Sequence, residues 1–139
     1  MANILERQII EEGPRNAVVK LTGVLDSSDV SETPAIQLTD FSNNDASCGP
    51  LAGLRVDAVM YSMGLNIDIL LSWNSNSPQQ IMPLAGRGKI DVSGDGGMIP
   101  DMLRSGYNGA INLVTTGFSA LQPPQNFTIL LRLVKLYSR

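Results

Sequence analysis

The chain has 139 residues, one cysteine and no histidine, and its 13 acidic and 10 basic side chains give a net charge of −3. This length fits a single domain that can bury a hydrophobic core without a metal or a disulfide. Because histidine is absent, the chain cannot form a Ser-His-Asp or Cys-His nucleophile system, a histidine-ligated metal site or an imidazole base. Cys48 is alone, so we expect no intramolecular disulfide.

Charge and hydropathy also bear on the partners of the chain. Its basic residues are scattered along a mildly acidic sequence, whereas phosphate binding favours a clustered positive surface, so we expect no nucleic acid partner. No run approaches the ~18 apolar residues of a membrane span, and the first residues do not resemble a signal peptide. We therefore expect no membrane partner and no classical secretion.

Apolar and polar residues alternate along most of the chain, which is typical of half-buried β-strands. Residues 15–26, 54–63 and 66–74 show this pattern most clearly. The inward-facing residues that it predicts are Ala17, Val19, Leu21 and Leu25, then Leu54, Val56, Ala58 and Met60, then Ile67, Ile69, Leu71 and Trp73. Because the second and third runs lie so close together, we expect a hairpin between them in which Gly64 has a positive φ. Gly23 lies on the inward parity and predicts a bulge or a close backbone approach.

Three further stretches continue the β pattern. Residues 80–84 and 89–92 are short and lie near Pro78 and Pro83, which predicts edge strands. Residues 107–116 alternate again. The last run, residues 126–137, is apolar on both faces, so we expect a central strand that is covered on both sides or partly buried by another subunit.

Two regions do not follow this simple pattern. Residues 3–12 fit either a short helix or an extended arm that folds back through Gly13 and Pro14, and we favour the extended arm. Residues 27–53 are rich in polar residues and proline, and we interpret them as one long polar loop. Loops of that length usually carry function or contact a neighbour.

Together these elements predict an all-β fold, an antiparallel β-sandwich or jelly roll. We expect one domain over residues 1–139, with an N-terminal arm at residues 1–14 and the long polar loop at residues 27–53.

The candidate chemical motifs are incomplete. Residues 91–96 resemble the start of a calcium loop, but Met102 stands where that loop needs a glutamate, so we interpret them as a glycine-rich turn. Residues 86–89 lack the full spacing of a phosphate-binding loop. We expect no catalytic residues, no cofactor and no metal, and we expect Trp73 to pack in the core.

Several segments resemble, in order and spacing, small structural proteins of tailed bacteriophages. They are residues 7–26 (RQIIEEGPRNAVVKLTGVLD), 54–57, 66–74, 84–91 and 127–135. The resemblance implies a head decoration, or cement, protein with a jelly-roll-like fold, made in the host cytoplasm and bound to the outer surface of the capsid. It further implies the major capsid protein as partner, assembly as a dimer or trimer, and a role in stabilising contacts between capsomers without enzymatic activity.

We assign candidate contact residues within this hypothesis. The capsid contacts fall on the arm and the long loop, at Ile4, Leu5, Arg7, Ile9, Ile36, Leu38 and Phe41. Self-association falls on the last strand, at Leu130, Arg132, Val134 and Leu136. One alternative is a receptor- or carbohydrate-binding virion module that uses Trp73, Tyr61 or Tyr107 as a stacking platform. Another alternative is a structural protein of the neck or tail.

Overall fold

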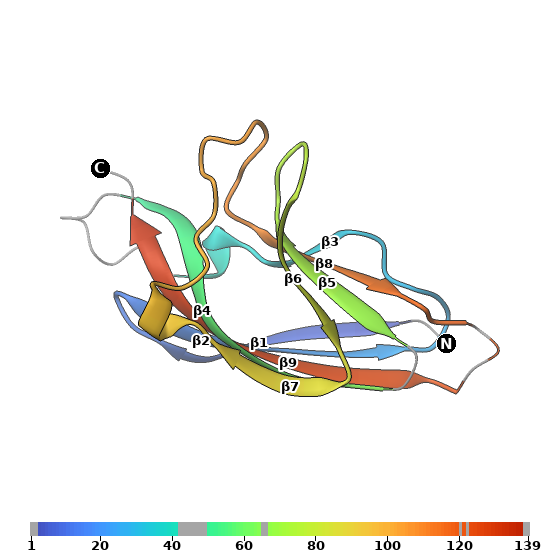
Figure 1. Cartoon of the computed structure of the whole chain (residues 1–139). Coiled ribbons are helices and arrows are strands. Elements are labelled where there is room, and N and C mark those ends of the chain that lie inside the picture. Colours follow the sequence, from blue (N-terminus) through green and yellow to red (C-terminus); the bar gives the residue numbers. More distant parts are fainter. Residues whose placement is uncertain (1–2, 42–49, 65–66, 120, 122, 138–139) are drawn as a thin grey trace.

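The fold is a sandwich of two antiparallel β-sheets (Figure 1), as a computed structural model shows for residues 3–41, 50–64, 67–119, 121 and 123–137. The five-stranded sheet has the order β1 (Ile4–Glu12), β2 (Asn16–Leu25), β9 (Gln125–Tyr137), β4 (Leu51–Met63) and β7 (Arg87–Asp91). The four-stranded sheet has the order β3 (Thr33–Ile36), β8 (Ile111–Thr116), β5 (Asp68–Trp73) and β6 (Gln79–Ala85). The predicted all-β sandwich is confirmed. No helix among the described residues is long and apolar enough to cross a membrane.

The strand pairs are nested in the manner of a jelly roll. β5 pairs with β6, β4 with β7, β3 with β8, and β2 with β9, so the chain alternates between the sheets on either side of the β5–β6 hairpin. The hairpin predicted between residues 54–63 and 66–74 is therefore wrong. β4 and β5 belong to different sheets, and Gly64 does not have a positive φ.

The core lies between the sheets and follows the alternation of the sequence. The fully buried residues of β2, β5 and β9 all come from the inward parity, and they include Val19, Leu71, Ile129, Leu131 and Leu133. The predicted positions of the later strands are also confirmed: β6 and β7 are sheet edges, and β9 is the middle strand of its sheet.

A β-bulge changes the inward-facing residues of β4. The pairing of β4 with β9 shifts between Val56 and Ala58, so Val59 faces the core and Met60 faces outward with 45% exposure. Because the side-chain period of a strand is two, one extra residue exchanges the two faces of everything that follows it. The predicted inward positions of Ala58 and Met60 are therefore wrong.

The two ambiguous regions both contribute strands. β1 is extended and pairs with β2 through a tight turn at Gly13 and Pro14, so the arm is confirmed and the helix alternative is wrong. β1 is an additional edge strand outside the nested pairs. The long loop is interrupted by β3 and by the short 3-10 helix η1 (Leu38–Asp40), and its residues 42–49, with Cys48, lie outside the described part.

An ion pair between a buried lysine and a partly exposed glutamate connects the end of β1 to β9. Lys135 Nζ lies 2.7 Å from Glu12 Oε2, and the Lys135 side chain is only 1% exposed. Its ammonium also lies 5.6 Å from the centre of the Phe41 ring.

We expect Glu12→Gln to destabilise the fold by about 2 kcal/mol, because it removes the carboxylate that compensates a buried ammonium. Urea unfolding measures this change, and the matched control is Glu11→Gln, which neutralises the neighbouring exposed residue. Equal stability of the two variants would contradict the role of the pair.

Gly23 is neither at the predicted bulge nor at a close backbone approach, but lies against a side chain: a Cβ at this position would overlap the ring of Phe127 on the neighbouring strand. We expect Gly23→Ala to cost about 1–3 kcal/mol through overpacking. The matched control is Gly94→Ala, where a Cβ meets open space. In a Phe127→Leu background the loss of stability caused by Gly23→Ala should be smaller. Thermal unfolding of the wild type, the Gly23→Ala and Phe127→Leu variants and the double variant measures this coupling.

Candidate docking surfaces

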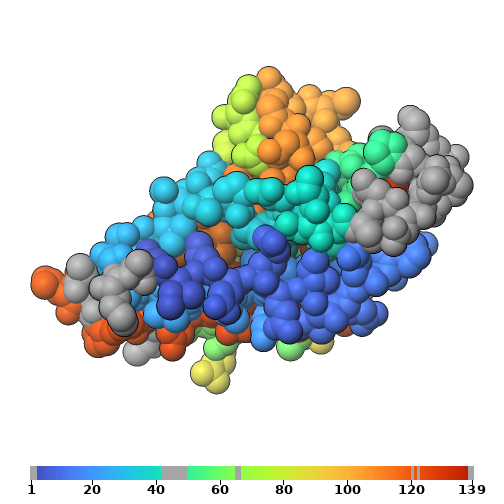
Figure 2. Space-filling view, turned by 180° about the vertical axis from the view of Figure 1, so that it is seen from behind, coloured from blue at the N-terminus to red at the C-terminus, as the bar shows by residue number. Residues whose placement is uncertain are grey.

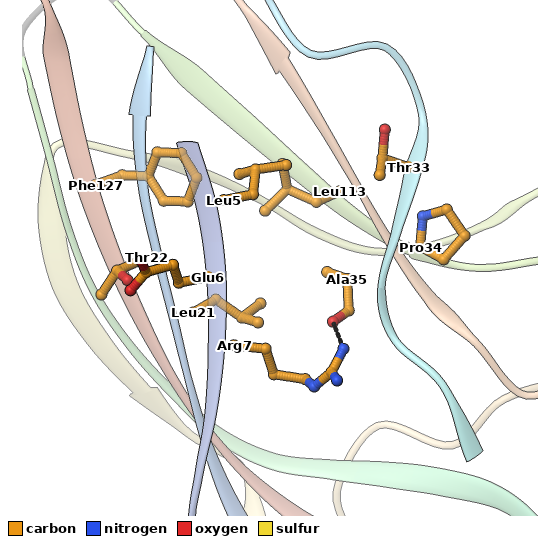
Figure 3. Close-up of a pocket in the computed structure, with 10 residues that line it drawn as sticks. All are labelled: Leu5, Glu6, Arg7, Leu21, Thr22, Thr33, Pro34, Ala35, Leu113 and Phe127. Atoms are coloured by element: carbon orange, nitrogen blue, oxygen red, sulfur yellow. Dashed lines mark hydrogen bonds between the residues drawn. The ribbon is translucent and has the colours of Figure 1, made fainter. Parts of the chain in front are cut away.

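The open edge of the sandwich carries a crevice between β1, β2 and β9 on one side and β3 and β8 on the other (Figure 3). It encloses about 160 Å³. The residues that line it are Leu5, Glu6, Arg7, Leu21, Thr22, Thr33, Pro34, Ala35, Leu113 and Phe127. Figure 2 shows β1 in dark blue, with the light blue to cyan segment that contains β3 directly above it. The floor of the crevice is thus apolar, with polar groups at its rim.

Arg7 links the two sheets across this edge. Its guanidinium lies 3.1 Å from Asp40 Oδ1 and donates a hydrogen bond of 3.5 Å to the carbonyl oxygen of Ala35 (Figure 3). The Arg7 side chain therefore fixes the position of η1 and β3 against β1.

β1 itself presents a long apolar and acidic edge. Ile4, Leu5 and Ile10 are 52%, 42% and 52% exposed. Glu6 and Glu11 are also exposed on this strand. Edge strands of this length and hydrophobicity are sites of pairing with another chain unless something covers them.

The structure separates the predicted capsid-contact residues into three groups, which are exposed, half-buried and buried. Ile4, Leu5 and Arg7 lie on β1 and are exposed, and Ile9 and Leu38 are half-buried beside the core. Ile36 and Phe41 are 0% and 6% exposed, so their side chains belong to the core and cannot contact a partner. The assignment of these two residues is wrong because Ile36 is the buried last residue of β3 and Phe41, directly after η1, also packs in the core.

The predicted self-association residues lie on the outer parity of β9. Arg132 is exposed, and Leu130 and Leu136 are half-buried. Val134 is only 6% exposed, because it lies between Asn16 of β2 and Arg55 of β4, so its assignment to a contact surface is wrong. Met60, which the bulge turns outward, joins Leu130 as a neighbour across the strands.

Sequence reasoning missed a pair of projecting loops (Figure 1). The loop after β5 and the segment before β8 are held together by backbone and side-chain hydrogen bonds from Asn76 to Ser105 and from Arg104 to Ser77. Leu103, in the segment before β8, is 96% exposed. The aperiodic, glycine-rich sequence before β8 shows only that a loop is present, not that it projects.

The aromatic residues bear on the carbohydrate alternative. Trp73 is 2% exposed and donates a hydrogen bond of 3.2 Å from Nε1 to the carbonyl oxygen of Leu54, so its predicted place in the core is confirmed. Tyr107 is half-buried, donates to the carbonyl oxygen of Ala52, and has its pKa raised by burial. A stacking platform at Trp73 is therefore wrong.

Ser93 stabilises the turn that begins at Asp91. Asp91 Oδ1 accepts hydrogen bonds from the backbone N–H and the hydroxyl of Ser93, at 3.0 and 2.6 Å. These bonds lower the pKa of Asp91. Among the described residues no group of three acidic, cysteine or histidine side chains is arranged to hold a metal ion.

Comparison with protein-family models, with curated proteins and with solved structures found no match to this chain.

We expect a carbon-detected NMR titration to give Asp91 a pKa below the ordinary aspartate value, and Ser93→Ala to raise it toward that value. Since the folded-state pKa is the lower one, the ionised form stabilises the fold at neutral pH, and this contribution disappears as the pH falls through the folded pKa. An unchanged pKa in the serine variant would contradict this explanation.

Proposed function

We propose that this protein is a structural component of a tailed-phage virion that decorates the outer surface of the capsid and stabilises contacts between capsomers. The observation that carries the proposal is the exposed edge of β1, which lies beside an open crevice. The jelly-roll strand order and the resemblance of residues 7–26 to phage structural proteins support it.

The contact that suits this edge is the addition of a strand from the capsid protein. An extended segment that pairs with β1 continues the five-stranded sheet, and its alternate side chains point to the same side as Leu5, toward the crevice. Main-chain hydrogen bonds then supply affinity, and the apolar crevice selects a matching side chain.

Charge favours a different chain over a second copy at this edge. β1 carries the exposed acids Glu6 and Glu11, whereas its other two charged residues, Arg7 and Glu12, are already paired with Asp40 and Lys135. Two β1 strands side by side would double this acidic excess, whereas a segment that alternates basic and apolar residues would neutralise it. The capsid segment should therefore be basic on the face that lies beside Glu6.

Binding to purified empty heads tests the proposal. We expect the wild-type chain to co-sediment with the heads, and Ile4→Lys/Ile10→Lys to weaken binding by about tenfold or more, because lysine on an edge opposes strand pairing. Leu121→Lys is the control, since Leu121 is 98% exposed in a loop outside the edge. Retained binding of the β1 variant would contradict the role of β1.

The number and position of copies in intact virions separate decoration from the neck or tail alternative. Many copies distributed over the shell are expected, whereas a few copies at one vertex would exclude decoration. The dimer or trimer implied by the resemblance stays a prediction, which sedimentation of the free protein tests.

A further inference from the structure

A second surface of the molecule has a different character from the β1 edge. On the outer face of the five-stranded sheet, strand pairing places Lys20, Leu130, Met60 and Lys89 in one row across β2, β9, β4 and β7. Neighbouring strands lie about 4.8 Å apart, so the two lysine residues at the ends of the row flank an apolar centre about 10 Å wide.

The apolar centre is hollowed. Val18, Ala58, Met60, Lys89, Leu130 and Arg132 line a depression of about 70 Å³. Met60 is 45% exposed and Leu130 is half-buried, so the depression is a feature of the surface and not part of the core. A depression of this size fits part of one apolar side chain from a partner.

The charges around the centre are mainly positive. Lys20, Arg87, Lys89 and Arg132 all occupy outward positions in the register of these four strands. They are four of the ten basic residues in a chain whose net charge is −3. Asp91 lies on the same face, where its carboxylate is 3.9 Å from Arg132, and the acids Glu6 and Glu11 lie at the far edge on β1.

We propose that this face is a docking surface for an acidic protein surface that inserts an apolar side chain between its own carboxylates. Opposite charges around an apolar anchor give both attraction and specificity. The proposal replaces the predicted self-association through Leu130 and Arg132. Arg132 is 55% exposed near the middle of the face, and symmetric docking about β9 would place it against the same arginine of a second copy.

The proposed surface stands on charge and geometry alone and does not depend on the capsid assignment. A designed β-hairpin that carries glutamate and leucine on one face serves as the probe. Titrated to millimolar concentration into isotopically labelled wild-type protein, it should shift the backbone NMR signals of Lys20, Met60, Lys89 and Leu130. The same hairpin with lysine in place of glutamate should not.

Charge reversal provides the matched comparison. Lys20→Glu/Lys89→Glu should weaken binding of the acidic hairpin by about tenfold or more. Arg15→Glu/Arg104→Glu changes the net charge equally, at residues outside this face, and should bind as the wild type does.

Several results would overturn the proposal. One is that the acidic hairpin shifts no NMR signals, or shifts signals of residues outside this face. Another is that both hairpins bind equally. A third is that the protein binds a short DNA duplex or phosphatidylglycerol vesicles more tightly than it binds the acidic hairpin. Self-association of the free protein that Lys20→Glu/Lys89→Glu alters would assign the face to a second copy instead. None of these results bears on co-sedimentation with heads, so the two proposals fail separately.

Discussion

The packing of β9 between β2 and β4 is the constraint on which the rest of the molecule depends. The inward residues of β9 are buried to 0–2% from Phe127 to Leu133, and they form the floor of the core beneath the four-stranded sheet. Since β9 occupies one side of β2, β1 can pair with β2 only on its far side. Gly23 leaves room for the Phe127 ring at this junction. The exposed edge of β1 is therefore a consequence of how the centre of the sheet is filled.

The β-bulge between Val56 and Ala58 determines which residues of β4 lie on the outer face of the five-stranded sheet. Asp57 occupies the bulge and is held by Arg55, whose Nε donates to Asp57 Oδ1 at 2.7 Å, while Met98 bonds to Val56 on the other side of the strand. The hydrogen bond to Asp57 raises the pKa of Arg55. Beyond the bulge Val59 fills the core and Met60 turns to the surface. Without the extra residue, Met60 would be buried and the basic face would lose its apolar centre.

The sequence correctly predicted the structural features that depend on residues close together in the chain. Regular alternation in β2, β5 and β9 specified their buried faces, and the prolines and short runs correctly indicated edge strands at β6 and β7. The wrong predictions concern features that depend on contacts between residues far apart in the chain. A short connection at Gly64 has the same sequence pattern whether it closes a hairpin or crosses between sheets. Nothing in the sequence of β4 indicates the bulge between Val56 and Ala58. β3 is four residues long with a proline, so its pairing with β8 and the burial of Ile36 have no periodic signal. The crevice likewise joins residues from five strands, which extend along the chain from Leu5 to Phe127.

The net charge of −3 conceals two surfaces of opposite sign. Acidic side chains collect on β1, where a strand can be added, and four basic side chains collect on the face formed by β2, β9, β4 and β7. Scattered positions in the sequence become neighbours because antiparallel pairing brings residues 20, 89 and 132 to one face. The net charge of the chain therefore indicates little about its partners, whereas the register of the sheet shows which charged residues lie together. A molecule with an acidic edge and a basic face can contact two different neighbours at once, which is the geometry that a protein linking adjacent subunits needs.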